Sequence, residues 1–393
     1  MKPQSTWILG PKLHFTRLVA TLPCRALEGL EECTTVPPKY LRRFLSIPII
    51  VLVGVVLLLG LPIWLGCTVL ADAILGIRRL RCTRILLFLL FVPWLEMVAV
   101  LLALGLWIRH LGQMRNPSAQ NRLQNLLSFY GHSLTSATRR LLGLRVVTTG
   151  LDSIEDGAPL LCFGHHTSLL DSFLPVEVLG HGRKYRMHYV IKKSLAYAPA
   201  FDIVGHWIPV HFVDRSGKNS ERETRAVGQL AANLPIRTTQ VIYPEGTFYT
   251  PARHARALKR LASEDPDLVA RAKELRYVLP PRAGGALSML EYNPTADVLF
   301  FVHAGFEPFE NIGRILRNVP FAETVRVHMW RVPRAEVPVE PRAQYRWLFS
   351  EFERMEHWVA RQLDSTSPTT AQPDTNAQER DTQNMASQAQ PVG

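Results

Sequence analysis

Paired cysteines and the usual metal-binding signatures are missing from this sequence. Neither an HExxH motif nor the GxSxG elbow of serine hydrolases occurs, so a zincin-type metal centre and a serine hydrolase are not expected. The five cysteines form no CxxC pair and no zinc-type spacing: Cys24, Cys33, Cys67, Cys82 and Cys162. We therefore expect them to be reduced thiols in a reducing compartment.

Acidic residues are scarce relative to basic ones, with 33 Asp and Glu against 45 Lys and Arg, which gives a net charge of +12. Such a balance suits a polyanionic partner: nucleic acid, an anionic membrane or a phosphorylated substrate. No RNA- or DNA-binding motif is present, and the basic residues flank apolar runs, so lipid headgroups are the expected partner and nucleic acid is not. The 393 residues suffice for one large domain or two ordinary ones.

Charge is absent altogether from residues 44–71, and Glu96 is the one charged residue in residues 85–108. Each run exceeds the ~20 apolar residues that span a bilayer. We predict an N-terminal segment (residues 1–43) followed by a membrane helical hairpin (residues 44–108), the alternative being a buried helix pair of a soluble protein. The first run begins too deep in the chain for an ordinary cleaved leader. Basic residues lie in the linker between the two runs and beyond both outer ends, so the positive-inside rule does not decide the orientation. A hairpin that enters the bilayer without fully crossing it is the alternative, because it would place every basic cluster on one face. For Glu96 we favour a structural or interfacial role over a functional one.

Beyond the hairpin, leucines at helical spacing predict an amphipathic helical linker over residues 109–144. Short β-rich runs then alternate with helical stretches at 220–234, 252–262 and 345–363, which indicates an α/β domain over residues 145–363. Its fold class is a mixed, largely parallel sheet flanked by helices. A polar tail at 364–393 is predicted to be disordered. The expected strands lie at residues 145–151, 160–164, 185–191, 207–213, 240–244, 297–304 and 325–330.

The segment GHHTSLLD directly follows one of these strands and holds His166 and Asp171. In a regular helix, residues five apart point about 140° apart, because each residue turns ~100°. The two side chains converge only if His166 sits at the strand end and Asp171 in the first helical turn. A carboxylate there would orient the imidazole as a general base. Ser168 and Asp171 also fit a capping box, and both interpretations can hold together. A metal site using His165, His206 or His211 lacks ligand spacing, so no metal is expected.

Two further segments could bind an anion. Glu245, Gly246 and Thr247 follow the predicted strand 240–244, and a glycine-containing turn after a strand can offer backbone N–H groups. An ordinary turn is the alternative. Arg215 closes the predicted strand 207–213, and arginine is suited to bidentate phosphate binding, although a surface charge is the alternative.

Together, four blocks in order resemble the glycerolipid acyltransferase family, which includes the lysophosphatidic acid (1-acylglycerol-3-phosphate) O-acyltransferases. The blocks are HHTSLLD (165–171), KKSLAYAPAFDIVGHWIPVHFVDR (192–215), YPEGT (243–247) and VLPPR (278–282). The resemblance implies a membrane-bound enzyme that transfers a fatty acyl group from acyl-CoA or acyl carrier protein to lysophosphatidic acid. It implies no cofactor, a bacterial inner membrane or its equivalent, and a catalytic domain facing the cytoplasm. It does not indicate an oligomeric state.

The resemblance also implies roles for individual residues. His166 would deprotonate the acceptor hydroxyl and Asp171 would orient it. Lys193, Arg215, Glu245, Gly246 and Thr247 would contact the acceptor, and Pro280, Pro281 and Arg282 would lie near the acyl donor. The sequence departs from the family pattern at His165, where asparagine is common, and at Phe248, where the third block usually has arginine. Arg253 or Arg256 could replace that cation. Phe248 leaves another lysophospholipid or a lyso-aminolipid as an alternative acceptor, and a non-enzymatic membrane scaffold as a third hypothesis.

Overall fold

The chain is described by a computed structural model that covers residues 36–76, 79–154, 157–168, 170–214, 220–306, 317–322 and 324–365. The predicted disordered tail, from residue 366 onward, and most of the predicted N-terminal segment lie outside these residues. So does Arg215, which the second sequence block places in the acceptor site.

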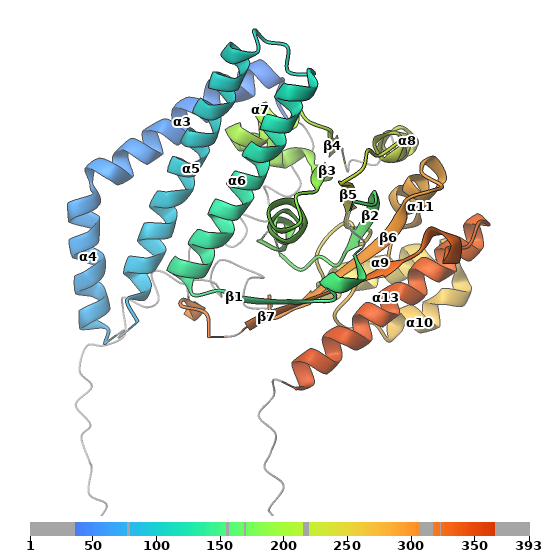
Figure 1. The fold of residues 1–393 in the computed structure, drawn as a ribbon. Helices are drawn as coiled ribbons and strands as arrows, with labels where there is room; N and C mark the ends of the chain where they lie inside the picture. The colour runs from blue at the N-terminus through green and yellow to red at the C-terminus, as the bar shows by residue number, and fades with distance from the viewer. Residues whose placement is uncertain are drawn as a thin grey trace, which may run out of the picture.

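Three apolar helices form the hairpin, which stands at one side of the molecule (Figure 1). The first predicted span is two helices rather than one, because α3 (Lys39–Leu59) ends at Gly60 and α4 (Leu61–Ile74) begins there. Pro62 lies in the first turn of α4, where its missing N–H costs no hydrogen bond. α5 (Arg81–Arg109) returns as a single helix.

Both α3 and α5 are long and apolar enough to cross a membrane, with mean hydropathy values of 2.2 and 2.6. Only 11% of the apolar window of α3 and 22% of that of α5 are buried inside the protein. The alternative of a buried helix pair in a soluble core is therefore not supported, because such helices would be covered. Exposed apolar side chains instead run along both arms, and a lipid environment would cover them.

The hairpin is fastened to the rest of the chain through α6 (Pro117–Leu142) and α7 (Pro199–Gly205). The buried carboxylate of Glu96 on α5 accepts a 2.6 Å hydrogen bond from the hydroxyl of Tyr130 on α6. It also accepts a 2.9 Å bond from the backbone N–H of Ala200 on α7. At the start of α3, Arg42 and Arg43 both pair with Asp202, whose side chain is fully buried. The structural role favoured for Glu96 agrees with these contacts.

A seven-stranded sheet forms the centre of the second part, in the order β1-β7-β6-β2-β5-β3-β4. All neighbours are parallel except β6 and β7. The predicted mixed, largely parallel sheet is thus confirmed, and all seven expected strands are present with small shifts at their ends. The strands are β1 (Arg145–Thr149), β2 (Leu160–Gly164), β3 (Arg186–Lys192), β4 (Val210–Val213), β5 (Thr238–Ile242), β6 (Asp297–Ala304) and β7 (Thr324–Val332).

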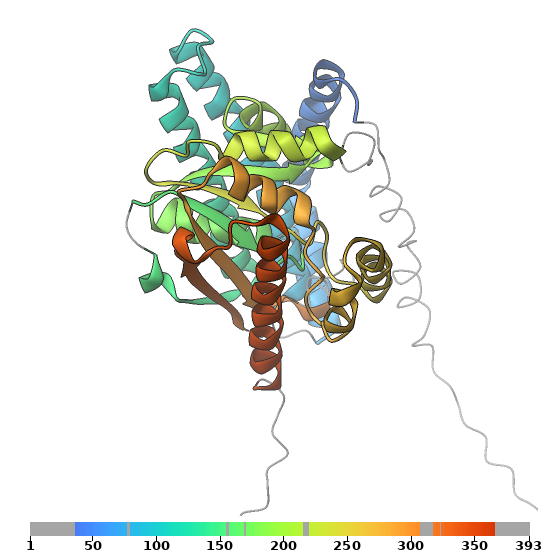
Figure 2. The same ribbon diagram turned by 90° about the vertical axis from the view of Figure 1, so that its right-hand side faces the viewer.

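Helices cover both faces of this sheet, so its central strands are buried on both sides. One face, with Leu161, Phe163 and Phe300, packs against α8, α11 and α13, which lie toward the viewer in Figure 2. The other face, with Leu160, Cys162 and Phe301, packs against the end of α6 and the helix that follows Asp171. The three helices on the first face are α8 (Ser220–Ala231), α11 (Ala283–Tyr292) and α13 (Pro341–Asp364). Two further helices, α9 (Pro251–Glu264) and α10 (Val269–Lys273), pack against α11 and α13.

Candidate active site

Four buried or half-buried ionisable side chains meet where parallel strands end. His166 follows β2, Glu245 follows β5, and His303 lies near the carboxyl end of β6. β2 pairs in parallel with both β5 and β6, and Gly164 lies opposite Phe301. Carboxyl ends of parallel strands share one edge, the usual position of active sites in open α/β sheets. Asp171 completes the group from the 3-10 turn Leu170–Phe173.

His166 and Asp171 form a hydrogen-bonded pair. The Nδ1 atom of His166 lies 2.8 Å from Oδ1 of Asp171. The other oxygen, Oδ2, accepts backbone hydrogen bonds from Thr167 at 2.6 Å and Ser168 at 2.7 Å. The backbone N–H of Asp171 in turn donates to the Ser168 hydroxyl at 3.4 Å. The carboxylate therefore caps its own turn and holds His166 at the same time.

The pair is asymmetric in exposure and charge. Asp171 is fully buried, while 13% of the His166 side chain remains accessible. Burial alone would raise the pKa of Asp171, but His166 and His303 beside it lower that pKa far below the ordinary value. Asp171 therefore stays ionised, and Nδ1 of His166 is held as its donor. This leaves Nε2 of His166 available to accept a proton from a substrate.

A second pair lies directly behind the first. Nδ1 of the buried His165 is 2.6 Å from Oε1 of Glu245, and that oxygen also accepts a 3.1 Å bond from the backbone N–H of His166. The other oxygen of Glu245, Oε2, accepts a 3.3 Å hydrogen bond from the backbone N–H of Leu279. Glu245 was expected to contact the acceptor, yet its side chain is wholly buried with both oxygens engaged. In this geometry it braces the backbone that carries His166.

His303 connects the two pairs. Its Nε2 atom lies 3.3 Å from Oδ2 of Asp171 and 3.1 Å from the carbonyl oxygen of His165, and its ring stacks on that of His165. Sequence reasoning missed His303, although one signal was present. It is a histidine near the carboxyl end of the predicted strand 297–304, the end of a parallel strand at which active sites form. In the structure it lies two residues past Phe301, which pairs with Gly164.

Burial raises the pKa of Glu245 to about 8, against about 4.5 for an ordinary glutamate, despite hydrogen bonds from the backbone of His166 and Leu279. Between about pH 4.5 and 8 the folded chain therefore keeps a proton that the unfolded chain has lost. Stability is consequently expected to fall as the pH rises through that window and to level off above it. One proton corresponds to a slope of at most about 1.4 kcal/mol per pH unit.

Glu245→Gln should remove this dependence, because the amide has the shape of the neutral acid and cannot ionise. We expect the melting temperature of the variant to change less than that of the wild type between about pH 5 and 8. The exposed Glu291→Gln on α11 is the matched control and should follow the wild type. Parallel curves for wild type and Glu245→Gln would contradict a protonated Glu245.

Aromatic rings confine the imidazole of His166. The ring of Tyr243 lies 4.6 Å away and that of Phe248 lies 5.1 Å away, the latter edge-on. A Cβ atom on Gly164 would come within 2.7 Å of the Tyr243 ring, so glycine is required there. The guanidinium of Arg253 lies over the Phe248 ring, 5.0 Å from the ring centre. Phe248, which departs from the family pattern, thus packs against the base itself.

The third and fourth sequence blocks lie together. The backbone N–H of Arg282 donates to the carbonyl of Pro244 at 2.9 Å. Gly246 has a φ of +73°, and a Cβ atom there would lie 3.1 Å from Nε of Arg282. The side chain of Arg282, expected in the acyl-donor region, therefore passes over the Glu245–Gly246–Thr247 turn. The tyrosine hydroxyl of Tyr345 on α13 donates to the carbonyl of Pro281 and fixes this segment.

The remaining expected site residues are more scattered. Lys193 begins a 3-10 turn after β3 and pairs with Asp214 at 3.5 Å. Thr247 is half-buried beside Phe248, whereas Pro280 and Pro281 are buried. Within the described part of the chain, no three His, Cys, Asp or Glu side chains are grouped so that they could hold a metal ion.

Comparisons with known proteins found one family model, a curated relative and a solved structure that are similar to this chain. Residues 145–293 match the family model described as Acyltransferase. The mouse (Mus musculus) protein 1-acyl-sn-glycerol-3-phosphate acyltransferase epsilon is 25% identical over 264 residues, covering 62% of this chain and 67% of its own. The solved structure of the 1-acyl-sn-glycerophosphate (LPA) acyltransferase PlsC from Thermotoga maritima aligns at 14% identity with a TM-score of 0.40. That alignment covers 67% of this chain and 98% of the other.

The chain is an acyltransferase. The resemblance drawn from the four sequence blocks is thereby confirmed. The matched region of the acyltransferase contains the dyad, Glu245 and Arg282 but ends before His303.

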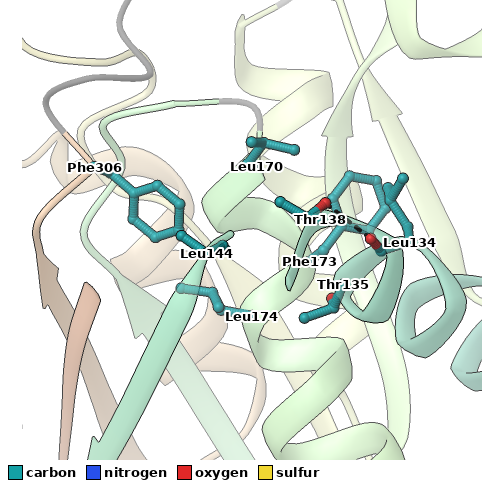
Figure 3. A pocket seen from close by; sticks show the side chains of 8 residues that line it. All are labelled: Leu134, Thr135, Thr138, Leu144, Leu170, Phe173, Leu174 and Phe306. Carbon is teal, nitrogen blue, oxygen red and sulfur yellow. Dashed lines mark hydrogen bonds between the residues drawn. The ribbon is translucent and has the colours of Figure 1, made fainter. Parts of the chain in front are cut away.

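An apolar recess of the acyltransferase lies between α6 and the turn Leu170–Phe173, which carries Asp171 (Figure 3). Its volume of about 10 Å³ is that of roughly one water molecule. A fatty acyl chain does not fit in this space without movement of the walls, so we do not assign the recess to the acyl chain. It is lined by Leu134, Thr135, Thr138, Leu144, Leu170, Phe173, Leu174 and Phe306.

Proposed function

We propose that this acyltransferase moves a fatty acyl group from acyl-CoA or acyl carrier protein to the hydroxyl of lysophosphatidic acid, which yields phosphatidic acid. The observation that carries the proposal is the His166–Asp171 pair, with its 2.8 Å bond, a buried ionised carboxylate and an accessible imidazole. The printed name of the mouse relative, an acyltransferase of 1-acyl-sn-glycerol-3-phosphate, supports this acceptor. Phospholipid biosynthesis is the corresponding process.

The reaction follows from the state of His166. Nε2 takes the proton of the acceptor hydroxyl as its oxygen attacks the thioester carbonyl, and Asp171 stabilises the resulting imidazolium. The tetrahedral intermediate then breaks its C–S bond, and the thiolate leaves with the proton from His166. An ester bond replaces the thioester, so the step needs no acyl-enzyme, metal or cofactor.

For the acceptor phosphate we propose the backbone N–H groups of the turn Glu245–Gly246–Thr247 together with Arg282. Because Gly246 has no Cβ, the Arg282 side chain can lie close to the turn, where an added Cβ would come within 3.1 Å of its Nε atom. Thr247 adds a hydroxyl to the same turn. Phe248 occupies the position where the family pattern has arginine, and it packs on His166 instead. We therefore propose Arg282 as the cation that replaces the family arginine, with Arg253 over the Phe248 ring as the alternative. Lys193, which follows β3, and Arg215, which lies outside the described residues, remain proposed contacts of the acceptor.

Arg282→Ala tests this assignment. We expect KM for lysophosphatidic acid to rise by roughly 10- to 100-fold, because a hydrogen bond to a charged group contributes about 1.5–3 kcal/mol. We expect kcat to change much less, since the arginine binds ground state and transition state alike. Arg276→Ala, an exposed arginine in the same segment, is the control. An unchanged KM would place the phosphate elsewhere.

A second acceptor class follows from Phe248. Without an arginine at that position, another lysophospholipid or a lyso-aminolipid is the alternative acceptor. A panel of lyso-lipids tested with the wild-type enzyme separates the two acceptor classes. Turnover of another lyso-lipid without turnover of lysophosphatidic acid would favour the alternative. The non-enzymatic scaffold is disfavoured, because the dyad contacts are complete.

We further propose that α3 and α5 hold the enzyme in a bacterial inner membrane or its equivalent, with the catalytic domain facing the cytoplasm. Their length and exposed apolar surfaces support membrane attachment. The acyl donors named above are made in the cytoplasm, which supports the orientation. This orientation can be tested by placing a tag after Asp364 and measuring whether protease can digest the tag in sealed vesicles.

A further inference from the structure

A hollow with a volume of about 760 Å³ lies where α3 begins, α5 ends and α6 begins. This volume is within the range of about 300–1,000 Å³ that ligand sites occupy. We call it the basic hollow, because its lining includes Lys39, Arg43, Arg115 and His206 and no Asp or Glu. The other lining residues are Gly112, Gln113, Met114, Asn116, Pro117 and Trp207.

The basic hollow is separate from the catalytic dyad. His206 and Trp207 follow α7 and precede β4, so they lie near the amino end of that strand. β4, β3, β5 and β2 are parallel, and His166 follows the carboxyl end of β2. The hollow and the dyad therefore lie toward opposite edges of the sheet.

Positive charge in the basic hollow exceeds the charge that the protein supplies to balance it. Asp202 is approached by Arg42, by Arg43 at 2.7 Å and by Nδ1 of His206 at 3.3 Å. Among the described residues, no carboxylate lies within ion-pair distance of Lys39 or Arg115, and both are exposed. Asp202 thus pairs with Arg42 and Arg43, while Lys39 and Arg115 line the hollow without such a partner in the described part of the chain, so a bound anion would offset their charge.

The surroundings of the basic hollow identify the kind of anion. Next to Lys39, α3 exposes Tyr40 and Phe44 to 74% and 75%. At the end of α5, Ile108 and Leu111 are exposed to 59% and 87%. These apolar side chains continue from the hollow along the two helices that are long enough to cross a membrane. An amphiphile with its anionic group in the hollow would place its acyl chains against them, which free phosphate cannot do.

We propose that the basic hollow binds the phosphate of an anionic membrane glycerophospholipid at a site distinct from the catalytic centre. Lys39 and Arg115 contact the phosphate, and Arg43 links it to Asp202 on α7. The bound lipid therefore joins the start of the hairpin to the catalytic domain. Anionic lipid surfaces attract lysine and arginine at the ends of membrane helices in the same way.

The test is a lipid titration of the full-length protein in neutral detergent, followed by native mass spectrometry. The probes are phosphatidylglycerol, phosphatidylcholine with the same acyl chains, and inorganic phosphate as a competitor. We expect tighter binding of phosphatidylglycerol than of phosphatidylcholine. In Lys39→Gln/Arg115→Gln, phosphatidylglycerol should bind roughly 10- to 30-fold more weakly, from the contribution of two cations near an anionic lipid.

Arg222→Gln/Lys273→Gln, on α8 and α10, is the matched control, because it removes the same two charges from exposed positions elsewhere. It should bind phosphatidylglycerol like the wild type. Equal loss in both double variants, no preference over phosphatidylcholine, or equally strong competition by inorganic phosphate would each overturn the proposal. The titration is repeated with His166→Ala, where unchanged binding is expected. A failure of the catalytic proposal is thereby distinguished from a failure of this one.

Discussion

His166→Ala is expected to lower kcat/KM for acyl transfer by at least about 10³-fold while the protein stays folded. General-base catalysis contributes typically 10²–10⁴-fold, and here the same imidazole both takes the hydroxyl proton and returns it to the leaving thiolate. The substitution removes a ring that is partly accessible and sits at a strand end, so the sheet beneath it keeps its packing.

The measurement is a membrane assay with radiolabelled acyl-CoA and lysophosphatidic acid. His132→Ala, which removes a half-buried histidine of α6 that pairs with Glu177, is the control for loss of an imidazole outside the site. It should keep near-wild-type turnover. Near-wild-type turnover in His166→Ala would contradict the proposed mechanism.

Asp171→Asn is expected to lose roughly 10²–10⁴-fold in kcat with an intact fold. The carbonyl oxygen of asparagine can still accept the backbone bonds of Thr167 and Ser168 that now reach Oδ2. Its NH₂ group would then face Nδ1 of His166 and force that atom to accept. The proton moves to Nε2 of the imidazole, so His166 can no longer accept one from the substrate.

Ser168→Ala separates the catalytic role of Asp171 from its capping role. It removes the hydroxyl that accepts the 3.4 Å bond from Asp171 N but leaves the bond between His166 and Asp171. We expect a modest loss of stability, about 0.5–2 kcal/mol, and nearly normal kcat. An Asp171→Asn protein that unfolds, or one that keeps full activity, would show that Asp171 serves the turn rather than the base.

Local patterns in the sequence predicted the strands and the meeting of His166 with Asp171. Both depend on residues that are close in the sequence. β-rich runs form strands, and side chains five residues apart can meet only where a strand end separates them from the following turn. Gly60, followed by Pro62, marked a break in the first membrane segment that hydropathy alone did not reveal, because the residues on both sides are equally apolar.

Contacts between distant segments could not be predicted in this way. Glu245 and His165 are 80 residues apart, and His303 is 138 residues from His165, so their contacts depend on strand order. With β2 placed between β5 and β6, the three residues meet at one edge. The same packing explains why Glu245, predicted to contact the substrate, is instead buried and supports the backbone of His166. It also explains why Arg282 lies at the turn that contains Gly246.

The central claim is tested most directly by identifying the product that the wild-type enzyme forms. Isotopically labelled acyl-CoA is supplied with lysophosphatidic acid to membranes from a host deficient in its own acyltransferase, and the lipids are analysed by mass spectrometry. The account predicts labelled phosphatidic acid that forms with wild type and not with His166→Ala. Labelled phosphatidic acid at equal rates from both proteins, or none from the wild type with labelled acyl-CoA and none when labelled acyl carrier protein is supplied instead, would contradict it.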